Sequence, residues 1–162
     1  MLSMIPSVIK GVSLADLDKI KTITRAAFPS VKQIGAKTLA EWIAKPKQSL
    51  LLVDVRSPRE FAVSHLRGAI NLRNASEIAR AISERKPAKT VLYCAVGFRS
   101  SQIARRIPAS IACEVFNLEG SIFEWVNQGH PIYRGEQVVW QVHPFGERWK
   151  GLLKPGLASD CA

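Results

Sequence analysis

Short apolar segments alternate with helical patterns over most of this 162-residue chain, and this alternation restricts its fold more than any other feature. The apolar segments are continuous, as in strands that are buried on both faces. We predict strands at residues 31–34, 50–53, 69–72, 90–93 and 113–117. We predict the helices between them at residues 38–44, 58–64, 75–83, 100–107 and 121–128. An α/β fold follows, with a mostly parallel sheet of about five strands and helices on both faces.

The alternation defines one domain with an extension at each end. Residues 31–133 contain it, and a chain of this length can bury one hydrophobic core. Residues 1–30 contain a helical pattern in which Leu17 and Ile20 share one face, so we predict an N-terminal helical extension. Residues 134–162 break the alternation and are predicted to form a C-terminal extension that packs on or beside the domain.

Charge and apolar pattern restrict the classes of partner. The formal net charge is +10, and the excess of Lys and Arg falls in the first two thirds of the chain. Such a charge favours small anionic substrates, whereas nucleic acid is not favoured because basic and aromatic residues do not interleave. No apolar stretch approaches the roughly 20 residues that cross a bilayer, so no membrane partner is expected. The N-terminus lacks the pattern of a secretory signal, and the expected location is cytoplasmic.

Cysteine and histidine usage argues against a disulfide framework and against a metal site. The three cysteines, Cys94, Cys113 and Cys161, are an odd number without close spacing, and the three histidines are scattered. We therefore expect no metal and no organic cofactor. Cys113 is interpreted as a core strand residue, and Cys161 as an incidental thiol in a tail.

Cys94 stands where a predicted buried strand turns through a tight loop into a helix. Gly97 permits a positive φ, so successive backbone N–H groups can turn toward the sulfur and form an anion-binding nest. The following helix, predicted to begin near Ser100 or Ser101, adds the positive end of its dipole. An ordinary thiol has a pKa near about 8.5, and lowering it by about two units would make the thiolate the majority form at neutral pH. Cys94 is therefore the predicted nucleophile, with Arg99 as a further source of positive charge.

Three separated blocks of the sequence resemble the rhodanese family of sulfurtransferases. Together they extend over most of residues 31–133, and three ordered blocks seldom arise by chance. Two positions depart from the family pattern: Ser64 and Ser121 each stand where a glycine is common. The blocks are residues 54–61 (DVRSPREF) with 65–71 (HLRGAIN), residues 94–99 (CAVGFR), and residues 118–122 (LEGSI) with Trp125 and 129–131 (GHP).

The resemblance implies a rhodanese-like three-layer sandwich and a sulfurtransferase reaction. A sulfane sulfur would pass from a donor such as thiosulfate to Cys94, as a persulfide, and then to a thiol-containing protein or small molecule or to cyanide. By the same resemblance Arg56 and Glu60 brace the loop after their strand, whereas Asp54 and Arg59 lie nearer the mouth of the site as substrate-binding candidates. The other substrate-binding candidates form the loop and the start of its helix: Ala95, Val96, Gly97, Phe98, Arg99 and Ser100.

Two other classes of function share this fold. A phosphatase or arsenate reductase needs a loop one residue longer than the four residues that separate Cys94 from Arg99. Those phosphatases also usually place histidine where Tyr93 stands. A non-catalytic rhodanese-like module that only binds a protein partner is the other alternative, and many such modules lack the cysteine that this chain retains.

Overall fold

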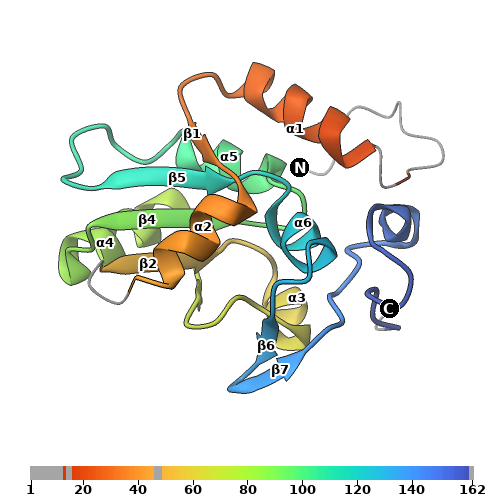
Figure 1. Ribbon diagram of the computed structural model, residues 1–162. Coiled ribbons are helices and arrows are strands. Elements are labelled where there is room, and N and C mark those ends of the chain that lie inside the picture. The colour runs from red at the N-terminus through yellow and green to blue at the C-terminus, as the bar shows by residue number, and fades with distance from the viewer. Residues whose placement is uncertain (1–12, 14–15, 46–48, 161–162) are drawn as a thin grey trace.

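A five-stranded parallel sheet forms the centre of the molecule in the computed structural model (Figure 1). The structure describes residues 13, 16–45 and 49–160. The strand order is β1-β5-β4-β2-β3, and every neighbouring pair is parallel. The predicted α/β fold is thereby confirmed. The strands are β1 (Lys32–Ile34), β2 (Leu50–Asp54), β3 (Ile70–Asn71), β4 (Lys89–Tyr93) and β5 (Glu114–Leu118).

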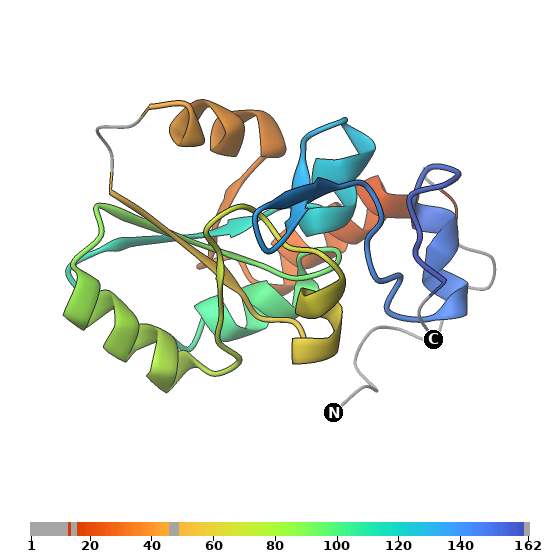
Figure 2. The same ribbon diagram turned by 90° about the horizontal axis from the view of Figure 1, so that it is seen from below.

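Helices cover both faces of the sheet and complete the three layers (Figure 2). Side chains of β2 alternate between two cores, because successive residues of a strand point to opposite faces. Leu52 packs in the core that includes residues of α2 and α6, whereas Leu51 and Val53 pack in the core that includes residues of α4. The helices are α1 (Asp16–Ala27), α2 (Ala36–Ile43), α3 (Pro58–Val63), α4 (Ala75–Arg85), α5 (Phe98–Ala104) and α6 (Ser121–Asn127).

The helix after Cys94 differs from its predicted boundaries for a local reason. α5 begins at Phe98, before the predicted start near Ser100, because Gly97 at φ 100° already turns the chain into the helix. α5 ends at Ala104, before the predicted end at residue 107. The N–H groups of Arg106 and Ile107 bond to carbonyls three residues back, so the chain leaves the α-helix through tighter turns.

A capping box fixes the start of α3 and, with it, one acid of the site. The Ser57 hydroxyl accepts a hydrogen bond from the Glu60 N–H at 3.3 Å, and the Glu60 carboxylate accepts one from the Ser57 N–H at 3.0 Å. Pro58 occupies the first helical turn, where a missing N–H costs nothing. The Glu60 side chain is therefore held back over the start of its own helix.

The two terminal segments pack on the sheet domain. Leu17 and Ile20 of α1 are buried in the same core as α6, whereas residues 14–15 lie outside the described part of the chain. At the other end, an antiparallel hairpin crosses the predicted boundary after residue 133 and leads to a 3₁₀-helix that also enters this core (blue in Figure 1). Among the described residues, no helix has the length and apolar character needed to cross a bilayer. These elements are β6 (Ile132–Arg134), β7 (Gln137–Val139) and η1 (Glu147–Leu152).

Candidate active site

Cys94 lies directly after β4, at the carboxyl edge of the sheet, and is 1% exposed. The loop turns back at Gly97, whose φ is 100°. A Cβ atom at this position would lie 3.2 Å from the carbonyl oxygen of Leu118 and 3.3 Å from the amide nitrogen of Asn117. Glycine is therefore required here for its backbone conformation and for the close approach of the next strand end.

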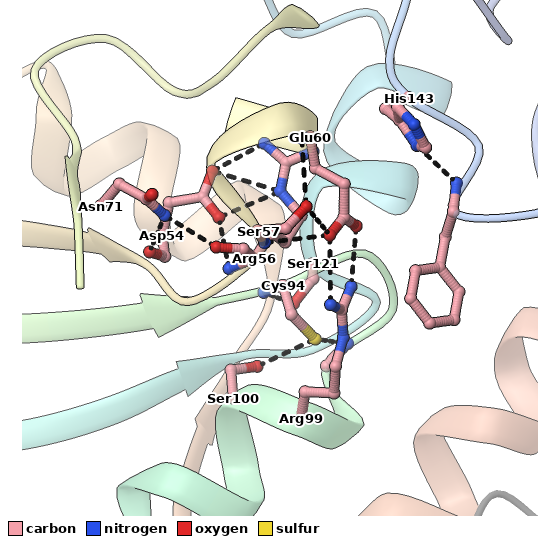
Figure 3. Close-up of polar contacts among 12 residues, drawn as sticks. Asp54, Arg56, Ser57, Glu60, Asn71, Cys94, Arg99, Ser100, Ser121 and His143 are labelled. Carbon is pink, nitrogen blue, oxygen red and sulfur yellow. Dashed lines mark hydrogen bonds and ion pairs between the residues drawn. The ribbon is translucent and has the colours of Figure 1, made fainter. Parts of the chain in front are cut away.

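The Cys94 sulfur receives hydrogen bonds from its own loop. The Gly97 N–H donates to Sγ at 3.1 Å. The Ser100 hydroxyl, which points toward Sγ in Figure 3, lies 3.4 Å from it. Burial raises the pKa of the Cys94 thiol, but the charge of Arg99 and the hydrogen bonds from Ser100 and Gly97 outweigh burial, and the pKa ends below its ordinary value. The arrangement thus favours a thiolate.

Arg99 is held beside this sulfur by Glu60. Its guanidinium donates to the two carboxylate oxygens at 2.9 and 3.2 Å, as Figure 3 shows. Burial raises the pKa of Glu60, but the hydrogen bonds and charge of Arg99 and the hydrogen bonds of Ser57 lower it to about 2. Glu60 is therefore ionised at neutral pH, and it braces the loop by fixing Arg99.

Asp54 does not lie at the mouth of the site, where we had expected it. It is 0% exposed, and its carboxylate accepts hydrogen bonds from the equally buried Arg56 guanidinium at 2.6 to 3.2 Å. The adjacent Asn71 amide donates to the backbone carbonyls of both residues. This buried cluster orders the turn after β2, because each charge needs its partner once water is excluded. Arg59, by contrast, is exposed.

A buried polar network behind the loop was not predicted. The Ser100 hydroxyl lies at hydrogen-bond distance from the Asn117 side-chain oxygen as well as from Cys94 Sγ, and its single hydrogen can point to either of them. The Asn117 amide donates to the Gln33 side chain at 2.6 Å. Ser121, at a glycine position of the family, has a φ of 47°. Its hydroxyl accepts the Cys94 N–H at 3.1 Å and donates to a carbonyl at the end of β5. Only Asn117 could have been found from the sequence, because a polar residue at the end of a buried strand requires a hydrogen-bond partner.

The loop residues form part of a small pocket over the sulfur. Ala95, Val96, Phe98 and Arg99 line it, whereas Gly97 and Ser100 lie on the side of the hydrogen bonds to Sγ. Phe145 and Trp149 of the C-terminal segment also line the pocket, and neither was among the predicted site residues. The described residues contain no cluster of three or more His, Cys, Asp or Glu side chains able to hold a metal ion.

Cys113 does not line this pocket. Cys113 precedes β5 and is half-buried, with its sulfur 3.3 Å from the Thr90 hydroxyl, so it lies just before the strand in which we had predicted it. Cys161 lies outside the described residues.

A cysteine whose sulfur accepts a hydrogen bond from its own short loop, at the carboxyl edge of a five-stranded parallel sheet, defines the class of this protein as a rhodanese-type α/β domain. The chain belongs to the Rhodanese-like domain family, which residues 35–128 match. The resemblance found from the three sequence blocks is thereby confirmed.

Known proteins similar to this chain include named sulfurtransferases. It is 31% identical over 106 residues to a Sulfurtransferase of Allochromatium vinosum, covering 65% of this chain and 98% of that protein. It is 29% identical over 102 residues to the probable adenylyltransferase/sulfurtransferase MoeZ of Mycobacterium tuberculosis, covering 60% of this chain and 25% of that protein. A crystal structure of thiosulfate sulfurtransferase from Pseudomonas aeruginosa superposes with a TM-score of 0.61 at 16% identity, covering 77% of this chain and 24% of that one, and shows the shared fold.

Proposed function

We propose that this protein is a sulfurtransferase that carries a sulfane sulfur on Cys94 as a persulfide. The observation that supports this best is the setting of the Cys94 sulfur, which accepts the Gly97 N–H at 3.1 Å beside the charge of Arg99. Both interactions favour an anion at this position, first the thiolate and then the persulfide. The sulfurtransferase names of relatives in the same family support the same reaction class.

In the first half-reaction, the Cys94 thiolate attacks the outer sulfur of a small anionic donor such as thiosulfate. A new S–S bond forms to Sγ while the S–S bond of the donor breaks, and sulfite leaves with the electron pair of that bond. Arg99 is the cation nearest to this sulfur in the pocket lining, and its guanidinium can attract the donor and stabilise the negative charge.

In the second half-reaction, a thiolate of an acceptor protein or small molecule attacks the outer sulfur of the persulfide. The S–S bond breaks, Cys94 leaves as thiolate, and the acceptor departs as a persulfide; cyanide would leave as thiocyanate. The loop N–H groups stabilise both anionic forms of Cys94, so neither half-reaction has to create an unsolvated charge. A free catalytic thiol also fits a reducing compartment, and we propose that the protein acts in the cytoplasm.

Phosphoryl or arsenate chemistry is the alternative reaction on this fold. The four-residue spacing from Cys94 to Arg99 and the closely approached Gly97 make a small ring around one sulfur atom. A phosphoryl group would present three oxygens to the same donors, which requires a wider loop. The spacing therefore favours sulfur transfer.

Mass spectrometry of the protein after exposure to thiosulfate tests the proposal. We expect a gain of about 32 Da, the mass of one sulfur atom, which cyanide then removes. The gain should disappear in Cys94→Ser and persist in Cys113→Ser, a matched change at another thiol.

Absence of this gain with thiosulfate, thiosulfonates and alkyl persulfides would contradict sulfur transfer. Vanadate-sensitive hydrolysis of an aryl phosphate would then favour a phosphatase. Failure of both reactions would favour the non-catalytic binding module.

A further inference from the structure

The C-terminal segment closes the pocket above Cys94. Phe145 and Trp149 belong to this segment, and their side chains line the pocket together with Arg99 and the loop. Cys94 itself is 1% exposed, and the pocket has a volume of about 10 Å³, which is room for about one water molecule. The space suits the outer sulfur of a persulfide, while the rest of a donor or acceptor must lie outside it, next to the Phe145 ring and Arg99.

This segment is anchored to the domain on two sides. The Asn127 side chain at the end of α6 donates to the Leu152 carbonyl at 2.8 Å and accepts the Lys154 N–H at 2.9 Å. Val142 makes two backbone hydrogen bonds to residues 157–159, so the chain returns on itself. Trp149 and Leu152 are buried in the core shared with α6. The segment therefore has a defined position over the pocket.

The backbone at Phe145 is held in a conformation that is unfavourable for its type. Its φ is 67°, in the left-handed region, which costs a non-glycine residue about 1–2 kcal/mol. Its N–H donates to the His143 Nδ1 at 3.0 Å, and its ring centre lies 4.4 Å from the Arg99 guanidinium carbon. The ring is also 6.0 Å from that of Trp149. Interactions of the ring with the site thus accompany strain in the chain, a combination that is frequent at functional positions.

We propose that Phe145 and Trp149 are specificity-determining residues, which select the substrates of sulfur transfer by the bulk attached to the reacting sulfur. Slender donors and acceptors reach Cys94 past the Phe145 ring and Arg99, whereas a wide substituent collides with the aromatic pair. This inference rests on the proposed sulfur transfer at Cys94 and adds residues outside the matched family region, which ends at residue 128.

Two thiosulfonate anions that share one reacting end provide the test. In both methanethiosulfonate and benzenethiosulfonate, the Cys94 thiolate attacks the outer sulfur, the donor S–S bond breaks, and a sulfinate leaves with its electron pair. We expect the protein to prefer the methyl compound. Phe145→Ala should raise kcat/KM for the phenyl compound relative to the methyl compound by about tenfold, a size typical of steric discrimination.

Two further variants distinguish the effect of the size of the Phe145 ring from a general loosening of the C-terminal segment. Phe145→Leu keeps much of the bulk and should shift the ratio less than Phe145→Ala. Trp140→Ala removes a 51% exposed aromatic residue from the same segment and should leave the ratio unchanged. A ratio that stays within about twofold in Phe145→Ala, or that shifts equally in Trp140→Ala, would overturn the inference.

Alkylation keeps the inference testable if no donor transfers sulfur. The rates at which N-methylmaleimide and the wider N-phenylmaleimide modify Cys94 can be followed by the mass of its peptide. A preference for the methyl reagent that falls in Phe145→Ala supports size selection even if the proposed function fails. An unchanged preference overturns size selection even if persulfide forms.

Discussion

Replacing Gly97 by alanine should weaken both the fold and the anionic state of Cys94. The φ of 100° costs an alanine about 1–2 kcal/mol. The new Cβ would also lie 3.2 Å from the Leu118 carbonyl oxygen, a backbone atom that cannot move freely, and this crowding adds about 1 kcal/mol. We therefore expect Gly97→Ala to lower the free energy of unfolding by about 2–3 kcal/mol in urea titrations.

The same change should raise the pKa of Cys94. Relief of the crowding moves the Gly97 N–H away from Sγ, which it now approaches at 3.1 Å. A hydrogen bond with a net worth of about 1 kcal/mol in favour of the thiolate corresponds to about 0.7 pKa units. At a pH below the pKa, the thiolate fraction and the rate of Cys94 alkylation by iodoacetamide should fall about fivefold. The pH dependence of that rate, followed on the Cys94 peptide, measures the pKa.

Gly129→Ala is the matched control for this prediction. Gly129 has a φ of 83°, and an added Cβ would meet nothing within 4 Å. Gly129→Ala should lower the free energy of unfolding only by the backbone strain of about 1–2 kcal/mol, and it should leave the pKa of Cys94 unchanged. If Gly97→Ala loses stability while the pKa of Cys94 stays at its parent value, the loop N–H does not stabilise the thiolate and our account of the site is wrong.

Three further predictions concern the residues around the loop. Ser121→Ala should destabilise the fold by about 1–3 kcal/mol in urea titrations, because the buried Cys94 N–H loses its acceptor, whereas Ser121→Gly should cost less since glycine relieves the strain at φ 47°. Arg99→Gln should raise the pKa of Cys94, because the charge of Arg99 lowers it, and the rise of the sulfur-uptake rate with pH should move to higher pH. The pKa of Glu60 is lowered to about 2, so its stabilising contribution is present above its unfolded pKa of about 4.3 and is lost as pH falls through about 2. Glu60→Gln should therefore lower the free energy of unfolding at pH 7 by on the order of 3 kcal/mol, but should change it little near pH 2. Urea midpoints measured at both pH values would show this difference.

The strands and the loop after Cys94 could be predicted because their signals are local. Continuous apolar runs correspond to β2 and β4, since both faces of these strands are covered. Gly97 marks the loop by itself, because only a glycine tolerates its φ together with the close approach of Leu118. The parallel register then places Asp54 beside Tyr93, so the turns after β2 and β4 meet at one edge.

The partners of the charged residues could not be predicted in the same way. Asp54 is the last residue of β2 and Glu60 follows it in the same block. Asp54 nevertheless pairs with Arg56 in the interior, whereas Glu60 pairs with Arg99, 39 residues away in sequence. Which acid meets which arginine depends on the direction of the chain after the strand and on the capping box of α3. Neither is visible in residue spacing, which explains the wrong position predicted for Asp54.

The C-terminal segment changes how the reactivity of Cys94 has to be understood. Its residues show no periodicity, and Phe145 adopts a left-handed backbone that its residue type disfavours, so no local pattern indicated a residue over the pocket. With Phe145 and Trp149 in place, burial raises the pKa of the thiol, while the same exclusion of water strengthens the attraction between the thiolate and Arg99. Because the two effects oppose each other, removing the Phe145 ring should change access to Cys94 more than it changes the Cys94 pKa.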